Sequence, residues 1–213
     1  MSRFVKILFF ALIVRPVVLF VLGLNKRGLD NLPQKGPAVI AANHNSHLDT
    51  LVLMSLYPLS MVHKLRPVAA ADYFFRNRYL KWFALNCIGI IPLDRSGESD
   101  RSKLFDPCHK ALDRGDILIL YPEGSRGKPE ELGRLRKGLF FMLAQRKQTP
   151  VIPVLMNGLG YALPKGEALL VPYCCDVIIG PAMLSGEDPV AFTRQLTEVF
   201  HELEQYCLSK EIL

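Results

Sequence analysis

The chain has 213 residues, of which half are apolar and 22% are charged, so it suits one globular domain and excludes a disordered chain, a collagen or a coiled coil. The net charge of +6 is uneven, because residues 1–150 hold 23 Lys and Arg against 12 Asp and Glu, whereas residues 151–213 hold 3 against 8. A basic half with a net +11 indicates an anionic partner (nucleic acid, a membrane surface, a phosphorylated substrate or an acidic carrier protein), although it would also serve as a solubilising surface.

The first predicted element is an apolar stretch over residues 4–24, which is long enough to cross a bilayer. Arg15 and Pro16 interrupt it, and a proline biases the residue before it away from helix. We therefore expect two apolar pieces of about ten residues each, inserted shallowly in a membrane. A single spanning helix, a cleaved signal peptide and a buried helix hairpin remain alternatives. This organisation predicts a membrane-associating segment over residues 1–25 and one domain over residues 26–213, at the cytoplasmic face of the membrane.

Beyond this segment, short apolar runs predict strands, and stretches with apolar residues at helical spacing predict helices. The strand-like runs are 37–42, 68–71, 88–93, 117–121, 151–156 and 177–179, and the helical stretches are 104–112, 135–143 and 192–207. Their alternation predicts a single α/β domain with a mostly buried mixed sheet flanked by helices. Pro153 inside one run predicts an edge strand or a bulge.

A polar motif, Asn-His-Asn-Ser-His-Leu-Asp over residues 43–49, directly follows the first of these runs. Such polar residues lie where α/β sheets usually bind ligands, beyond the carboxyl ends of their strands. His44 could accept a proton near neutral pH, and Asp49 could orient its ring and stabilise the imidazolium. The two can meet only if His44 precedes the helix, because residues five apart on a helix lie on different faces. Ser46 and Asp49 resemble a capping box, which would leave His44 in the turn and free to fold back.

Three alternatives remain open for this motif. Asp49 could serve only as a helix-capping residue, and His47 could be a solvated residue of the first helical turn. His44, His47 and Asp49 could also bind a metal ion, although neither HxH nor HExxH accompanies them.

Two later motifs place an arginine beyond a predicted strand. Arg95 ends the motif over residues 89–95, where its planar guanidinium could bind a phosphate. The motif over residues 121–127 reads Tyr-Pro-Glu-Gly-Ser-Arg-Gly, in which Pro and Gly predict a sharp turn. Glu123 and Arg126 of this turn could pair with each other, or could offer an acceptor for hydroxyls and a fork for phosphate.

Taken together, the motifs resemble those of the glycerolipid acyltransferases of the 1-acylglycerol-3-phosphate acyltransferase (PlsC-like) family. Members of that family have a His, four intervening residues and an Asp, then G-x-I-x-x-x-R, then F-P-E-G-[ST]-R, then V-x-P-V. This chain has all four in that order over about residues 38–156, with Tyr121 in place of the Phe. The matching residues are His44, Asp49, Gly89, Ile91, Arg95, Glu123, Gly124, Ser125, Arg126, Val151 and Pro153.

The resemblance implies transfer of a fatty acyl group from acyl-CoA or acyl-carrier protein, as co-substrate, to the free hydroxyl of a lysophospholipid in the membrane. The expected acceptor is 1-acylglycerol-3-phosphate, giving phosphatidic acid, with another lysolipid or glycerol-3-phosphate as alternatives. His44 would be the general base oriented by Asp49, and neither a metal nor a further cofactor is expected. Substrate binding would fall to Gly89, Arg95, Glu123, Gly124, Ser125, Arg126 and Pro153. The resemblance further implies that both arginines of this set grip the acceptor phosphate, that the Glu accepts a hydrogen bond from an acceptor hydroxyl, and that an apolar tunnel, which the sequence does not locate, holds the acyl chain.

Other classes of function make different demands on these residues. A lipid-binding protein without activity would not need the pair of His44 and Asp49. A metal-dependent hydrolase would use His47 as well. Nucleic acid is not an expected partner, because the basic residues alternate with apolar runs and no nucleic-acid-binding motif is present.

Overall fold

The structure is a computed structural model, and it describes residues 2–75, 77–94, 103–127, 130–163 and 169–209. Its strands are β1 Leu22–Arg27, β2 Ala38–Ala42, β3 Leu65–Ala70, β4 Ile91–Leu93, β5 Ile117–Leu120, β6 Val151–Asn157 and β7 Tyr173–Ile179. Its α-helices are α1 Ser2–Phe9, α2 Arg15–Val21, α3 Leu48–Ser55, α4 Ala71–Phe74, α5 Arg78–Phe83, α6 Asp106–Asp113, α7 Gly138–Leu143, α8 Leu159–Ala162 and α9 Pro189–Glu204. Single π-helical turns cover Phe10–Val14 and Ala84–Ile88, and 3₁₀ turns cover Leu29–Asn31 and Val62–Lys64.

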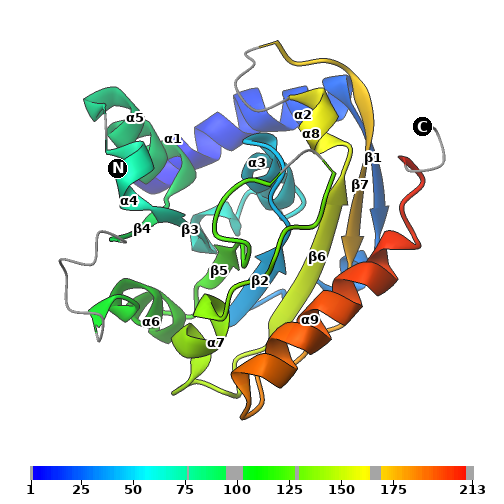
Figure 1. Cartoon of the computed structure of the whole chain (residues 1–213). Helices are drawn as coiled ribbons and strands as arrows, with labels where there is room; N and C mark the ends of the chain where they lie inside the picture. The colour runs from blue at the N-terminus through cyan, green and yellow to red at the C-terminus, as the bar shows by residue number, and fades with distance from the viewer. Residues whose placement is uncertain (1, 76, 95–102, 128–129, 164–168, 210–213) are drawn as a thin grey trace.

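The strands form one seven-stranded sheet in the order β1-β7-β6-β2-β5-β3-β4 (Figure 1). All neighbouring strands are parallel except β6 and β7, so β1 and β7 run against the other five. The predicted single α/β domain with a mixed sheet flanked by helices is therefore confirmed. Every predicted strand-like run contributes to a strand. The run over residues 88–93 does so only from Ile91, because a π-helical turn occupies its start.

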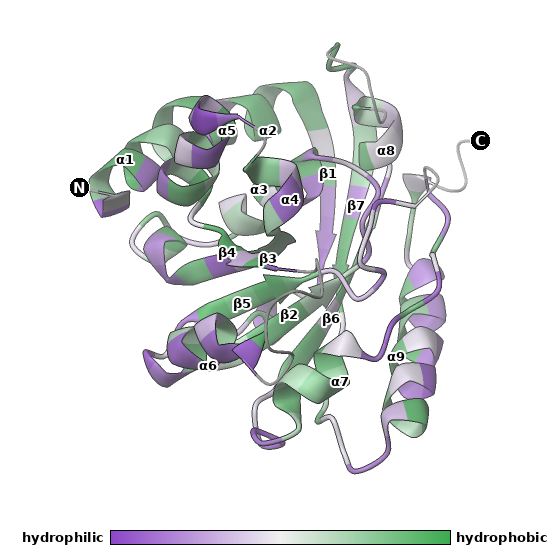
Figure 2. Cartoon of the chain, turned by 60° about the vertical axis from the view of Figure 1, so that its left-hand side comes forward, coloured by the Kyte–Doolittle hydropathy of each residue, from purple (hydrophilic) through white to green (hydrophobic). Residues whose placement is uncertain are grey.

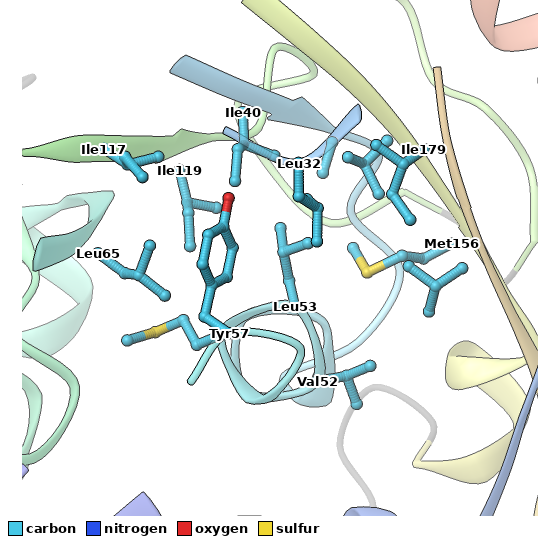
Figure 3. Packing of buried hydrophobic residues seen from close by; sticks show 14 of the residues in the cluster. Leu32, Ile40, Val52, Leu53, Tyr57, Leu65, Ile117, Ile119, Met156 and Ile179 are labelled. Carbon is cyan, nitrogen blue, oxygen red and sulfur yellow. The ribbon is translucent and has the colours of Figure 1, made fainter. Parts of the chain in front are cut away.

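The sheet separates two apolar clusters, and the central strand β2 feeds both of them. Successive side chains of a strand point to opposite faces. Ile40 accordingly packs with Leu53 and Tyr57 of the α3 side, as Figure 3 shows, whereas Val39 packs with the cluster under α6, α7 and α9. All five residues of β2 are buried. Burial on both faces explains why this strand is a continuous apolar run rather than an alternating one.

The N-terminal segment is one helical run, so the predicted break at Pro16 is wrong. The Arg15 N–H donates to Phe10 five residues back, and this π-turn lets the helix continue into a proline that has no N–H of its own. The run packs one side on the domain, where Phe10 is buried and the Arg15 guanidinium donates to the Tyr57 carbonyl at 2.7 Å. Within the described residues, one helix, Arg3–Val21, has the length and composition needed to cross a membrane.

Strand β1 follows this helix immediately and was not predicted. It begins at Leu22, which pairs with Tyr173 of β7. The boundary that we placed after residue 25 therefore falls inside a strand of the sheet. The apolar residues Leu22 and Leu24 continue the hydrophobic run, so hydropathy alone could not separate helix from strand here.

Pro153 lies in β6, an interior strand, so its predicted place at a sheet edge is wrong and the bulge alternative fits. Its carbonyl accepts from the Gly180 N–H at 2.9 Å, which puts its own nitrogen on the side facing β7. The ladder with β7 ends at Val154, and Val151 next bridges Met183. Two residues of β6 thus face three residues of the segment that follows β7. Pro153, which has no N–H to donate, falls in this irregular stretch.

Candidate active site

His44 is fixed just beyond the carboxyl end of β2. The preceding residue, Asn43, is buried and binds Met156 of β6 twice, because its amide donates to the Met156 carbonyl at 2.8 Å and accepts from the Met156 N–H at 2.7 Å. The His44 ring stacks on Tyr121, with ring centroids 4.0 Å apart. These contacts hold one face of the imidazole and the backbone that carries it.

His44 and Asp49 are in direct contact, as the motif predicted. His44 Nδ1 lies 2.9 Å from Asp49 Oδ2, and the same oxygen accepts the N–H groups of Asn45 at 2.7 Å and Ser46 at 2.9 Å. The carboxylate is fully buried in the first turn of α3. Because a carboxylate accepts, Nδ1 carries the proton in the neutral ring and Nε2 has the free lone pair.

The predicted capping box forms only in part. Helix α3 begins at Leu48, so His47 rather than Ser46 is the N-cap, and the His47 side chain makes no capping bond. Asp49 still accepts from the Ser46 N–H, as a capping box requires of its acidic residue. The Ser46 hydroxyl accepts from the Leu48 N–H at 3.3 Å and donates to the Leu163 carbonyl at 3.0 Å. Ser46 therefore ties the turn to the segment after α8.

His44 lines a cavity of about 890 Å³ at the carboxyl ends of β2, β3 and β5. His47, Thr50 and Arg126 lie with it at the polar end. The remaining wall is mainly apolar and includes Val68, Leu80, Phe83, Ile90, Leu93, Leu104, Phe105, Leu120 and Leu139. This volume is within the range of small-molecule sites, and the apolar wall suits a hydrocarbon chain.

The Arg126 guanidinium faces this cavity with a donor to spare. Its Nη1 is buried without a hydrogen-bond partner among the described residues, and its central carbon lies 6.0 Å from the Tyr73 ring centre. Arg126 and Glu123 form no ion pair in the described part of the chain, so the alternative that they neutralise each other is not supported. A partly buried guanidinium with a nitrogen that has no partner among the described residues suits an anionic group of a ligand.

Glu123 holds the backbone instead of facing the cavity. It is buried, and its two carboxylate oxygens accept the His44 N–H at 2.8 Å and the Gly133 N–H at 3.0 Å. Burial raises the pKa of Glu123, and the two N–H bonds oppose that rise. Glu123 therefore links the backbone at His44 to the backbone at Gly133, and its contact with an acceptor hydroxyl stays a prediction.

The glycines predicted for this site have different places. Gly124 lines the cavity with φ of 79°, and a Cβ added there would lie 3.2 Å from Arg136 Nε, so the turn needs glycine. Gly89 has φ of 78°, ends the π-helical turn before β4 and does not line the cavity. Its contact with substrate stays a prediction.

Of the three remaining residues predicted to bind substrate, one lies at the cavity wall. Ser125 is exposed at the cavity wall. Pro153 does not line the cavity, because it lies within β6 opposite Ala41 of β2. Arg95 lies outside the described residues.

His47 is exposed, as one alternative held, and it lies at the cavity. Its Nε2 is 3.2 Å from the Tyr73 hydroxyl. Partial desolvation of the ring by neighbouring groups and the nearby positive charge of Arg126 lower the pKa of His47, although much of the side chain is exposed. In the part of the chain that the structure covers, no group of three His, Cys, Asp or Glu side chains is arranged to hold a metal ion.

Glu130 belongs to the support of the site and was not predicted. Its oxygens accept the Gly158 N–H at 2.7 Å and the Gly160 N–H at 2.8 Å, and the Asn45 amide donates to it at 3.4 Å. It takes a left-handed backbone conformation with φ of 59°. In the sequence it is one of two adjacent glutamates in a polar stretch, so only the fold reveals which one is used.

The sequence model of the family described as Acyltransferase matches residues 23–157. That range contains β2, the turn of His44 and Asp49, and the motif of Glu123 and Arg126. The chain belongs to the Acyltransferase family.

Two curated relatives of this Acyltransferase chain illustrate the match. The chain is 31% identical over 68% of its length to the chloroplastic 1-acyl-sn-glycerol-3-phosphate acyltransferase LPAT1 of Arabidopsis thaliana, and 33% identical over 78% of its length to the 1-acyl-sn-glycerol-3-phosphate acyltransferase of Pseudomonas aeruginosa. It spans 38% and 61% of the length of these two relatives.

The crystal structure of the 1-acyl-sn-glycerophosphate (LPA) acyltransferase PlsC from Thermotoga maritima has the same fold. It matches with a TM-score of 0.75 over 96% of this chain and 80% of that one, at 17% identity.

Proposed function

We propose that this protein transfers a fatty acyl group from a thioester to the free hydroxyl of 1-acyl-sn-glycerol-3-phosphate, giving phosphatidic acid. One observation supports this most strongly. The pair of His44 and Asp49, 2.9 Å apart, lies at the end of an apolar cavity that also contains the unpaired guanidinium of Arg126. A protein that only binds lipid has no need of a buried carboxylate held on a histidine.

The proposed step begins at Nε2 of His44, which takes the proton of the acceptor hydroxyl as the oxygen attacks the thioester carbonyl. The C–S bond then breaks, and the imidazolium returns the proton to the leaving thiolate. Asp49 stabilises the imidazolium and keeps the ring in the required tautomer. The donor, acyl-CoA or acyl-carrier protein, is a co-substrate, and this step requires no further cofactor.

Recognition of the acceptor would fall to the arginines. Arg126 presents a nitrogen that has no partner among the residues that the structure describes, so a phosphate could bind it without breaking an ion pair seen there. The sequence offers Arg95 for the same purpose. A planar guanidinium can donate two parallel hydrogen bonds to one phosphate. This bidentate contact would orient the glycerol hydroxyl toward His44.

The apolar wall of the same cavity would hold the acyl chain during transfer. Leu80, Phe83 and Ile90 line it together with side chains from the ends of β3 and β5. Burying a chain there removes apolar surface from water, which contributes about 25 cal/mol per Å². We expect the preferred chain length to follow from the depth of this cavity.

The N-terminal helix would attach the enzyme to the cytoplasmic face of the membrane that holds its acceptor. Phe4, Leu12, Leu19 and Phe20 are exposed on it, and Figure 2 shows α1 and α2 coloured mainly as hydrophobic. Exposed apolar side chains of this density are typical of a membrane contact. Replacing Leu12, Leu19 and Phe20 by Ser should move the protein from the membrane pellet to the soluble fraction, and an unchanged distribution would contradict the attachment.

The experiment that tests the proposal mixes purified protein with 1-acyl-sn-glycerol-3-phosphate and acyl thioesters of increasing chain length, and identifies products by mass. We expect phosphatidic acid from the parent protein and a loss of about 10³-fold in kcat for His44→Ala. His63→Ala is the matched control, because His63 does not line the cavity. Circular dichroism shows whether each variant is folded. Turnover retained by folded His44→Ala would contradict the proposal.

A further inference from the structure

A second groove lies on the other side of the segment that carries Glu123 and Ser125. It has a volume of about 990 Å³ and runs between the chain leading into α7 and one face of α9. Figure 2 shows these two elements beside each other at the lower edge of the molecule. The sequence predicted α9 as an amphipathic helix from its apolar residues. The face of α9 that lines the groove has no role in the acyl transfer proposed above.

The groove is rich in cations. Arg134, Arg136, Lys137 and Arg194 line it, and all four side chains are exposed. The only carboxylate in its lining is that of Glu123, whose two oxygens already accept backbone N–H groups. Asp188 interacts with Lys137 and Arg194, and Glu198 lies next to Arg194, so with Glu123 three carboxylates face four cations. The groove keeps a net positive charge, which suits a polyanion.

The α9 wall of the groove adds hydroxyl and apolar surface. Val190, Thr193, Thr197 and His201 line it at spacings of three and four residues, which places them on one helical face. Both threonine hydroxyls donate to carbonyls of their own helix, and each oxygen can still accept. Arg194 approaches Glu198 only at 3.8 Å on an exposed surface, so that pair does not immobilise the guanidinium.

The groove and the catalytic cavity share a border. Ser125 and Arg136 line both of them, and Glu123 of the groove accepts the N–H of His44. A ligand bound in the groove could therefore extend past Ser125 toward the imidazole. Such a ligand needs a polyanionic end and an arm that carries the reacting group.

We infer that this groove binds the phosphorylated nucleotide of an acyl-CoA donor, while its pantetheine arm passes Ser125 and Arg136 to present the thioester to His44. The inference rests on the proposed acyl transfer. A 3′-phosphate and a diphosphate match the four cations, and the groove volume is that of a small-molecule site.

An acyl-carrier protein fits this groove less well. Carrier proteins are acidic over a broad surface, whereas residues 151–213, which include α9, hold 3 basic against 8 acidic side chains. Glu198 lies on α9 next to Arg194. Like charges at an interface repel, so the acidic residues around α9 favour a compact polyanion over an acidic protein as the ligand of this groove.

The test compares two donors that differ only in the nucleotide, an acyl-CoA and the same acyl group on N-acetylcysteamine. For Arg194→Ala and Lys137→Ala we expect KM for acyl-CoA to rise about tenfold, with kcat and KM for the acceptor unchanged. KM for the truncated thioester should not change. Lys110→Ala, an exposed lysine on α6 outside the groove, is the matched control. Calorimetric titration with 3′,5′-ADP should show binding to the parent and weaker binding to both variants.

The outcomes separate the inference from the proposed function. Unchanged KM for acyl-CoA, an equal rise for both thioesters, or a parent protein that accepts only acyl-carrier protein would overturn the nucleotide site and leave acyl transfer standing. A parent that transfers no acyl group from any of these donors would overturn both.

Discussion

The two sides of the segment from Tyr121 to Gly127 hold their charged groups in different ways. Around His44, the buried carboxylates of Asp49 and Glu123 accept five hydrogen bonds between them, four from backbone N–H groups and one from the His44 ring, so their oxygens are held in place. On the groove side, Lys137 and Arg194 are exposed to solvent. The difference indicates that the chain buries and fixes the groups that would move a proton and leaves exposed to solvent those that would attract a charged ligand.

The largest effect should come from the fixed side. Asp49→Asn removes the charge that stabilises the imidazolium and allows the amide to present an N–H to His44 Nδ1, which would favour the wrong tautomer. We expect kcat to fall by about 10²-fold to 10⁴-fold, with KM for both substrates nearly unchanged. Steady-state kinetics measures this, and Asp72→Asn, which changes an exposed carboxylate at the cavity wall, is the matched control. A variant with normal kcat would mean that Asp49 is only a capping residue.

An intermediate effect is expected where the two sides meet. Arg126→Ala should raise KM for the lysolipid by about tenfold to a hundredfold and leave KM for the thioester unchanged, because the unpaired guanidinium faces the cavity and not the groove. The opposite result, a rise for the thioester alone, would assign Arg126 to the donor and remove the distinction between the two sides.

Glu123 should show the smallest catalytic effect and a clear effect on stability. Glu123→Ala leaves the N–H groups of His44 and Gly133 without their acceptor, and we expect the free energy of unfolding to fall by about 1–3 kcal/mol. Denaturant unfolding measures this. A variant as stable as the parent would show that this link between the two backbone segments is dispensable.

The ionisation of Glu123 should make the free energy of unfolding depend on pH. Burial raises the pKa of Glu123 in the folded protein, so its contribution to stability is complete below the ordinary pKa of 4.5 and is lost as the pH rises through the folded value. Glu123→Gln cannot ionise and keeps one acceptor oxygen. The difference in unfolding free energy between parent and variant should therefore move against the parent as the pH rises from about 4.5 toward neutral. A difference independent of pH would contradict the raised pKa.

The sequence predicted those parts of the fold and site that depend on local pattern. Continuous apolar runs located β2, β5 and β6, and a His five residues before an Asp across a turn located the pair now seen at 2.9 Å. Strand β1 was not predicted, because its apolar residues continue the apolar run of α2. Its partner strand β7 also lies about 150 positions away in the sequence.

Partners that are distant in sequence explain the remaining differences. The motif of Glu123 ends a strand, but it does not predict that the Glu123 oxygens accept from the backbone of His44 and Gly133. Glu130 could not be told from Glu131 without the glycines it binds after β6. The basic groove forms only because α9 lies beside the segment before α7. No local sequence pattern predicts that these two segments are neighbours.

The central claim is that His44 and Asp49 act as one unit on the acceptor hydroxyl. The most direct measurement is kcat for His44→Ala, Asp49→Ala and the double variant, with the parent completing the cycle. We predict that the double variant is no slower than His44→Ala, because the carboxylate has nothing to orient once the ring is gone. Losses that multiply, with the double variant slower than His44→Ala by the full factor of Asp49→Ala, would show that the two residues act independently and would contradict the account.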